Sequence, residues 1–238
     1  MKFIKKIGIL GGIGPLAGAN FFQTLITLAQ EKYDAVQDCE FPQIFLNSAA
    51  IPGFDETGFT APDIFLAHLV RELQILEQMG SDFIIIACNT VHHHFQDLQD
   101  ALNIPILNLI EATAAKVHTD GVHVAGILSS ESTNQLQLYS GALESKGVKP
   151  LIATSDQQQV LNQIILNVMG GTQSRKDSAA LNEIVADMQG QGAQSVVLGC
   201  TELPLAFNRD GGPDTAHPVI YDSNEILAET ALEEAYGN

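Results

Sequence analysis

The sequence has little positive charge, few cysteines and no long apolar run. Only 11 of its 238 residues are lysine or arginine, against 28 aspartates and glutamates, and the formal charge is −17. Nucleic acids and anionic membrane surfaces are bound by clustered lysines and arginines, so this balance argues against both as partners. Hydrophobic residues make up 45% of the chain and charged residues 16%, which is an ordinary globular composition rather than a disordered one.

The scarcity of cysteine and of apolar runs also bears on where the protein works. Three cysteines are an odd number and do not form the pattern of a disulfide framework. Reduced thiols suit the cytoplasm, which is where we expect the protein. The sequence has no stretch of about 18 apolar residues, so no membrane span is expected. The apolar segment near the N-terminus is too short, and too interrupted by glycine, for a signal peptide.

What the sequence does have is a regular alternation of apolar strands and amphipathic helices. This alternation predicts an α/β fold with mostly parallel sheets flanked by helices. Strands are predicted over residues 7–10, 43–47, 83–87, 104–107, 122–128, 150–153, 195–199 and 218–221. Helices are predicted over 16–32, 62–79, 92–102, 110–118, 156–169 and 178–189, after 129–133 as far as about 146, and from a cap at Ser223 to about 236. Residues 47–60 are expected to form a loop over the site.

Two stretches of the chain share a pattern in which an apolar strand ends in a cysteine. The strand over 83–87 leads to Cys88, and the strand over 195–199 leads to Cys200. The carboxyl ends of parallel strands are where open α/β sheets bind their ligands. The elements around the two cysteines match in order, which indicates an internal duplication. We therefore predict two pseudo-symmetric lobes, with both cysteines facing one active site in the cleft between them.

The matched pattern also predicts the domain boundaries. The first lobe is expected to comprise residues 1–114 and 207–238, and the second lobe residues 115–206. The crossing points are expected in loops near 112–121 and 205–215. The final strand and the final helix are both expected to return to the first lobe.

Two thiols at matched places favour acid/base chemistry. A thiolate is a base as well as a nucleophile, and its ordinary pKa of about 8.5 lies near neutrality. Cys88 and Cys200 are expected to stand on opposite faces of a bound carbon acid, where one removes a proton and the other donates one. Such a pair inverts a stereocentre without a cofactor. The alternatives are a single cysteine nucleophile with a histidine base, or two ordinary core cysteines. Cys39 lies in a polar stretch and is interpreted as an incidental thiol.

The residues next to the two cysteines are candidates for binding the substrate. Asn89, Thr90 and Thr201 suit a carboxylate or an ammonium group, and turn or N-cap chemistry is their other role. Glu202 suits the amine of a substrate or local hydrogen bonds. His92 is expected to orient a neighbouring group. The three consecutive histidines that begin with it point about 100° apart on a helix, so they do not share a metal, and no metal site is expected.

A glycine-rich loop after the first strand is a further candidate binding element. Gly12, Ile13 and Gly14 precede a helix, where backbone N–H groups and the helix dipole favour a small carboxylate. A dinucleotide-binding turn needs a third glycine, and Ala17 stands in its place. Asn47, at the end of the second strand, completes the expected substrate-binding residues.

At these motifs the chain resembles the cofactor-independent aspartate/glutamate racemase family, and within it the aspartate racemase branch. The motifs are the loop Gly11-Gly12-Ile13-Gly14-Pro15, the stretch Ala87-Cys88-Asn89-Thr90-Val91-His92 and the stretch Gly199-Cys200-Thr201-Glu202-Leu203. The resemblance covers essentially the whole chain.

The resemblance implies an amino-acid racemase that interconverts L- and D-enantiomers and needs neither pyridoxal phosphate nor a metal. It implies that Cys88 and Cys200 are the acid/base pair, that Asn89, Thr90 and Thr201 hold the α-carboxylate and the amine, and that the protein is a homodimer. Two related reactions on the same scaffold stay open, namely cis-trans isomerisation of an unsaturated diacid such as maleate and racemisation of a hydantoin. A binding homologue that takes a small carboxylate without turnover is the alternative outside catalysis.

Two departures from the family pattern concern the side chain of the substrate. Aspartate racemases carry an arginine in the loop after the second strand and a lysine after a helix of the second lobe. Here residues 47–54 and 167–171 contain no basic residue, although Arg175 and Lys176 follow shortly after. An uncompensated carboxylate in a closed site is costly. The nearby Phe54 and Phe59 therefore suggest a substrate with a neutral or apolar side chain.

Overall fold

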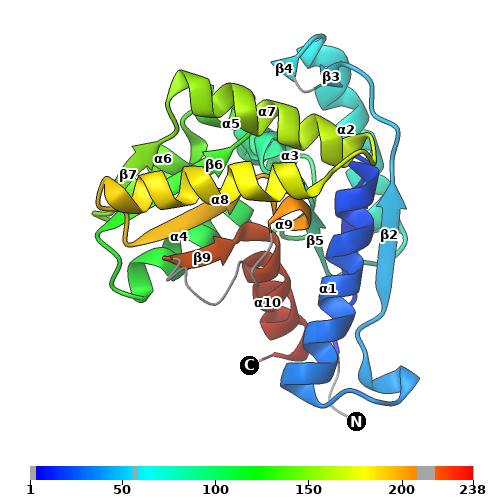
Figure 1. The fold of residues 1–238 in the computed structure, drawn as a ribbon. Coiled ribbons are helices and arrows are strands. Elements are labelled where there is room, and N and C mark those ends of the chain that lie inside the picture. The colour runs from blue at the N-terminus through cyan, green and yellow to red at the C-terminus, as the bar shows by residue number, and fades with distance from the viewer. Residues whose placement is uncertain (1–3, 56–57, 208–217, 238) are drawn as a thin grey trace. The chain divides into compact units, whose positions relative to one another are not determined.

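The computed structural model describes residues 4–55, 58–207 and 218–237, which divide into two units (Figure 1). Unit 1 consists of the chain up to Asp55, of Phe59–Ala112 and of the segment from Asn224, whereas unit 2 consists of Gly58 and Thr113–Ser223. Apart from the short excursion at Gly58, the chain passes between the units inside helix α4 (Leu109–Thr119) and at the start of helix α10 (Ser223–Tyr236).

Unit 1 is built on a parallel sheet of three strands in the order β2-β1-β5. The central strand β1 (Ile7–Gly11) pairs with β2 (Ile44–Ser48) on one side and with β5 (Phe83–Ile86) on the other. Both β1 and β5 are buried along their whole length, which is why each is an uninterrupted apolar run. Its helices are α1 (Pro15–Tyr33), η1 (Asp38–Glu40), α2 (Pro62–Gln78), η2 (Thr90–His94), α3 (Phe95–Asp100) and α10.

Helix α2 illustrates how local sequence sets these elements. Pro62 stands in its first turn, where the missing N–H costs no hydrogen bond, and Gly80 follows its end with a φ of 91°. Its buried residues recur at helical spacing and join the core below the sheet edge that carries Cys88. They are Phe65, Leu69, Leu73 and Leu76.

Unit 2 is built on a parallel sheet of four strands in the order β7-β6-β8-β9. The strands are β6 (Val124–Ser129), β7 (Lys149–Ile152), β8 (Ser195–Gly199) and β9 (Val219–Asp222). The helices are α5 (Glu131–Gln135), α6 (Leu138–Ser145), α7 (Ser155–Met169), α8 (Arg175–Gly190) and α9 (Leu203–Ala206). The apolar faces of α7 and α8 form one core cluster with Val196, Leu198 and Cys200, so the second cysteine is part of the core of this unit.

The predicted α/β class is confirmed, and most of the predicted elements lie within a few residues of their observed bounds. The prediction that the final strand returns to the first lobe is wrong. It pairs with β8 through Ser195–Val219 to Leu198–Asp222 and so stays in unit 2, while the helix after it belongs to unit 1. Its pairing partner β8 is the preceding strand of the chain, but the apolar pattern of a strand does not specify which sheet edge it joins. The loop expected near 205–215 falls largely on residues 208–217, which lie outside the described residues.

Three further predictions differ from the structure. The expected strand over 104–107 forms only a single bridge, between Ile106 and Ile84. The expected helix over 92–102 is a 3-10 turn followed by the short α3, and the helix expected as far as 146 is divided into α5 and α6 by Gln137, whose φ is 53°. The expected loop over 47–60 contains a two-stranded ribbon, β3 (Phe54–Asp55) and β4 (Gly58–Phe59). In the described ranges no helix is both long and apolar enough to cross a membrane.

Candidate active site

In unit 1, three loops meet at the carboxyl edge of the sheet. The register places Gly11 opposite Ser48 and Leu10 opposite Ile86, so all three strands end at the same level. Ala49 donates its N–H to the carbonyl of Gly11 (3.2 Å), and Ala87 donates its N–H to the carbonyl of Leu10 (3.0 Å). The glycine loop, the segment after β2 and the first cysteine motif are therefore neighbours.

The glycine loop has a geometry that only glycine tolerates. Gly12 and Gly14 have φ values of 90° and 79°, in the left-handed region. A Cβ on Gly12 would also lie 2.2 Å from the carbonyl oxygen of Ala49. Gly14 is the N-cap of α1, and Ile13 packs against the core cluster that includes Cys88. The loop thus places the N-terminus of α1 beside the first cysteine motif.

The first cysteine motif is buried at the end of β5. Cys88 is 7% exposed, Asn89 3% and Thr90 4%, so the polar groups of this turn are held away from bulk water. Cys88 belongs to the core cluster that includes Leu10 and Ala49. Cys88 therefore lies at the sheet edge as part of an apolar core cluster.

His92 makes a hydrogen bond to the backbone of this motif. Its Nδ1 lies 2.9 Å from the carbonyl oxygen of Cys88, and the N–H of Leu109 donates to its Nε2 (3.2 Å). Because Nε2 accepts, Nδ1 carries the proton and donates it to the carbonyl of Cys88. Burial lowers the pKa of His92, which keeps the ring neutral. The expectation that His92 orients a neighbour thus has a definite geometry, in which it joins the cysteine turn to the start of α4.

The end of β2 carries an acidic neighbour instead of a cation. The side-chain amide of Asn47 donates to Oε2 of Glu72 on α2 (2.8 Å). The β3 and β4 segments bring Phe54 and Phe59 together, with ring centroids 5.2 Å apart, and both pack against the cluster that contains Cys88. The segment after β2 thus adds apolar rings to the cluster around Cys88, and the side-chain amide of Asn47 is bound by a carboxylate.

In unit 2 the second cysteine motif follows β8 in the same way. The register places Gly199 opposite Ser129, and Cys200 follows directly, 7% exposed. The thiol donates a hydrogen bond to Oε2 of Glu202 (3.1 Å), and the hydroxyl of Thr201 donates to the same oxygen (2.9 Å). The structure thus places the carboxylate of Glu202 against the thiol of Cys200.

The burial of Glu202 affects how readily its carboxylate takes a proton. Burial raises the pKa of Glu202, an effect opposed by the hydrogen bonds from Cys200 and Thr201. A carboxylate with a raised pKa accepts a proton from a neighbouring thiol more readily than an exposed carboxylate does. The carboxyl group of Glu202 is therefore placed where it can accept the proton of the Cys200 thiol.

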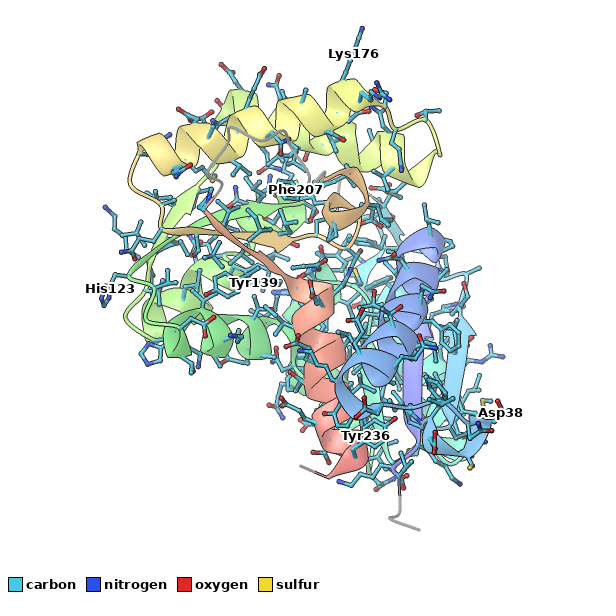
Figure 2. The ribbon with its side chains drawn as sticks, turned by 60° about the horizontal axis from the view of Figure 1, so that its bottom comes forward. Asp38, His123, Tyr139, Lys176, Phe207 and Tyr236 are labelled. Carbon is cyan, nitrogen blue, oxygen red and sulfur yellow. The ribbon has the colours of Figure 1, made fainter. Side chains whose placement is uncertain are left out.

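Within each unit the structure brings most of the expected site residues together. Unit 1 gathers the glycine loop with the segment from Cys88 to Thr90, and unit 2 gathers Cys200, Thr201 and Glu202. That the two cysteines face one shared site stays a prediction. Arg175 and Lys176 are exposed at the start of α8, and Figure 2 shows the Lys176 side chain extending away from that helix. All three cysteines lie among the described residues, and none is in a disulfide.

Sequence reasoning missed two contacts that shape these motifs. The partner of His92 at Leu109 follows from the fold alone, because no sequence signal connects the two. The aromatic ring of Tyr139 packs on Gly199, just before Cys200, and was likewise not found. The short spacing between Cys200 and Glu202 was a usable signal for their hydrogen bond.

Comparison with known proteins assigns the chain to a family. The family model for Asp/Glu/Hydantoin racemase matches residues 10–231. A broad specificity amino-acid racemase of Bacillus subtilis (strain 168) is 27% identical over 226 residues, which cover 95% of this chain and 96% of that protein.

Solved structures agree with this assignment. The crystal structure of an aspartate racemase homologue from Pyrococcus horikoshii OT3 is 27% identical, with a TM-score of 0.81 over 98% of this chain and 99% of that one. The aspartate racemase of Picrophilus torridus is 25% identical, with a TM-score of 0.81 over 98% of this chain and 94% of that one. The family match spans nearly the whole chain, and it contains both cysteine motifs. The chain therefore belongs to the Asp/Glu/hydantoin racemase family and is an isomerase of the racemase class.

Proposed function

We propose that the protein is a cofactor-independent amino-acid racemase in which Cys88 and Cys200 exchange protons with opposite faces of the substrate's Cα. The observation that carries this proposal is the matched placement of the two thiols. Each lies directly after the carboxyl end of a buried parallel strand, and each is 7% exposed. The Bacillus subtilis relative, named as a broad specificity amino-acid racemase, supports an amino acid as the substrate.

In the proposed reaction the two thiols exchange protons with Cα directly. One cysteine, as the thiolate, takes the proton from Cα, and the electron pair of the C–H bond delocalises into the α-carboxylate. The other cysteine, as the thiol, then donates its proton to the opposite face. Each turnover leaves the first cysteine protonated and the second ionised, so the enzyme is ready for the reverse direction.

The neighbours of the thiols supply binding and proton control. Asn89, Thr90 and Thr201 hold the α-carboxylate and the amine, and the start of α1 after Gly14 offers N–H groups to a carboxylate. Glu202 is better suited to hold the proton of Cys200 than to bind the amine, because its Oε2 already accepts from Cys200 and Thr201.

The substrate that fits best has a neutral or apolar side chain. The segment after β2 carries no basic residue, and the amide of Asn47 is engaged by the carboxylate of Glu72. Phe54 and Phe59 add apolar surface beside the first cysteine motif. A second carboxylate on the substrate would lose hydration against this apolar surface, which is costly. Aspartate is therefore a poor substrate under this proposal.

Hydantoin racemisation is the second candidate, since the matching family model includes that activity by name. A hydantoin is also a carbon acid, and the same pair of thiols would serve it. Assembly as a homodimer and a place in the cytoplasm stay predictions.

The test is hydrogen exchange at Cα. The protein is incubated with single L-amino acids or with a substituted hydantoin in D₂O, and loss of the α-proton and gain of the D-enantiomer are followed by NMR and chiral chromatography. We expect turnover of neutral amino acids to exceed that of aspartate, and we expect Cys88→Ala and Cys200→Ala to abolish racemisation.

Cys39→Ala is the matched control, because Cys39 is an exposed thiol outside both motifs. Racemisation that survives in both Cys88→Ala and Cys200→Ala would refute the two-thiol mechanism. Absence of exchange with every compound, combined with ligand-induced stabilisation, would identify a binding homologue instead.

A further inference from the structure

Tyr139, on α6, lies directly against the backbone that carries Cys200. It is among the largest fully buried side chains, with 1% of its surface exposed. A Cβ on Gly199 would lie 2.5 Å from Cε2 and 2.8 Å from Cδ2 of its ring. Real side chains do not approach so closely, so the ring occupies the space that any other residue at position 199 would need. The ring therefore sets the position of the residue that precedes Cys200.

The hydroxyl of Tyr139 connects the same strand end to two other segments. It makes hydrogen bonds with Thr113 and with Ser223, and Figure 2 shows Tyr139 close to the point where β9 leads into α10. Ser223 donates its only hydroxyl proton to the carbonyl of Leu198 (2.8 Å). Because that proton is used, Ser223 accepts from Tyr139, and Thr113 is the second partner of the same phenol hydroxyl. These hydrogen bonds connect α4 with the end of β8.

The two partners of Tyr139 stand at special places in the chain. Thr113 and Ser223 are the first and last residues of the long segment that forms unit 2. Both are fully buried, with no exposed surface. Leu198, which ends the series, pairs with Asp222 in the register of β8 and β9 and lies two residues before Cys200. One phenol group therefore joins the entry point, the exit point and the strand end that carries the thiol.

We propose that Tyr139 is a positioning residue that holds Cys200 in register with the two points at which the chain enters and leaves unit 2. This inference rests on the proposed role of Cys200 as an acid/base group. Its ring packs against Gly199 and limits the position of that residue. Its hydroxyl links Thr113 to Ser223, which in turn donates to the carbonyl of Leu198. Loss of the hydroxyl leaves the strand end free to shift, and a small shift of a thiol relative to Cα lowers the rate of proton transfer more than it lowers binding. Burial raises the pKa of Tyr139 well above its ordinary value, so the hydroxyl keeps its proton under assay conditions.

The first test compares Tyr139→Phe with a matched control. Phenylalanine keeps the ring on Gly199 and removes only the hydroxyl. We expect kcat to fall about tenfold, with KM changed by less than about twofold, because placement of the thiol rather than binding is affected. Tyr221→Phe is the control, since the Tyr221 hydroxyl also makes a partly buried hydrogen bond in unit 2, to Asp120 (2.8 Å). A kcat of Tyr139→Phe equal to that of the control would overturn the proposal.

Variants at Thr113 test the series of hydrogen bonds. Thr113→Val removes one hydrogen-bond partner of the Tyr139 hydroxyl, and we expect a loss of kcat similar to that of Tyr139→Phe. The double variant should be no worse than either single variant, because both changes break the same connection. Thr113→Ser, which restores a hydroxyl, should recover most of the lost kcat relative to Thr113→Val. Additive losses in the double variant, or failure of serine to recover kcat, would refute the connection.

A second readout requires no substrate. Iodoacetamide alkylation of Cys88 and Cys200 is followed separately by peptide mass spectrometry over a range of pH. We expect Tyr139→Phe to raise the alkylation rate of Cys200 at least about threefold and to leave that of Cys88 unchanged. Equal changes at both thiols, or none at Cys200, would show that Tyr139 has only a general structural role. If the wild-type protein turns over no amino acid, the proposed function fails, while this readout still decides the placement of Cys200.

Discussion

The contact between Glu202 and Cys200 gives the sharpest prediction about the reaction. Glu202→Gln keeps the size and shape of the side chain and one accepting oxygen, but the amide cannot take a proton from the thiol. In the wild-type protein Oε2 accepts from both Cys200 and Thr201, at 3.1 and 2.9 Å. The variant thus separates the role of Glu202 as a proton acceptor from its role in packing.

The expected loss follows from the type of bond removed. A hydrogen bond to a charged group contributes about 1.5–3 kcal/mol, which corresponds to about 10- to 150-fold in rate when it acts only in the ionised state. A positioned proton acceptor contributes about 10²- to 10⁴-fold. We therefore expect kcat/KM to fall about 10²-fold. The loss must be equal in both directions, because the two enantiomers of a substrate with one stereocentre are equally stable.

The stability of the same variant should change in the opposite sense. Burial raises the pKa of Glu202, so the folded protein favours the protonated carboxyl more than the unfolded chain does. The folded state is then stabilised at low pH and loses this advantage as the pH rises from the ordinary carboxyl range through the raised pKa. Glutamine has no such pH dependence. The difference in melting temperature between Glu202→Gln and wild type should therefore increase in favour of the variant from pH 4 to pH 7.

The assay follows racemisation in both directions over a range of pH, with thermal unfolding in the same buffers. Glu131→Gln is the matched control, because the Glu131 carboxylate also accepts two side-chain hydrogen bonds in unit 2 but is exposed. Activity of Glu202→Gln within about threefold of wild type, with an unchanged pH profile, would refute Glu202 as the proton acceptor of Cys200.

Two further predictions concern unit 1. Gly12→Ala should destabilise the protein by about 3 kcal/mol or more, because the new Cβ would overlap the Ala49 carbonyl at a positive φ. Gly141→Ala, in an open helical position, is the control and should be neutral or stabilising. Equal effects of the two variants on urea unfolding would contradict this prediction. The lowered pKa of His92 means that the unfolded chain binds a proton below about pH 6.5 that the folded protein does not, so stability falls as the pH drops from 7 to 5.5. His92→Gln should flatten that dependence in urea titrations at the two pH values, and an unchanged slope would rule out His92 as its source.

The local pattern of the sequence determined the elements and the candidate chemistry. Buried parallel strands require continuous apolar runs, so β5 and β8 were visible as such, each ending at a cysteine. Glycines with positive φ and prolines in first helical turns marked the boundaries of α1 and α2. Asn89, Thr90, Thr201 and Glu202 could be named as candidates because they follow the cysteines directly. These features depend on near neighbours, whose geometry is set by backbone sterics and side-chain spacing.

Only the tertiary structure decided which distant groups meet. Strand β9 pairs with β8 because backbone hydrogen bonds form between any two exposed strand edges, and its own sequence does not specify which edge. The direction of the Glu202 carboxylate, toward the thiol of Cys200, depends on how the turn after β8 is packed. The Tyr139 ring packs on Gly199, and the N–H of Leu109 donates to His92. Both contacts join residues that are distant in the sequence, and they follow from the packing of whole elements. The sequence thus named the two thiols, and the fold supplied the groups that hold each of them.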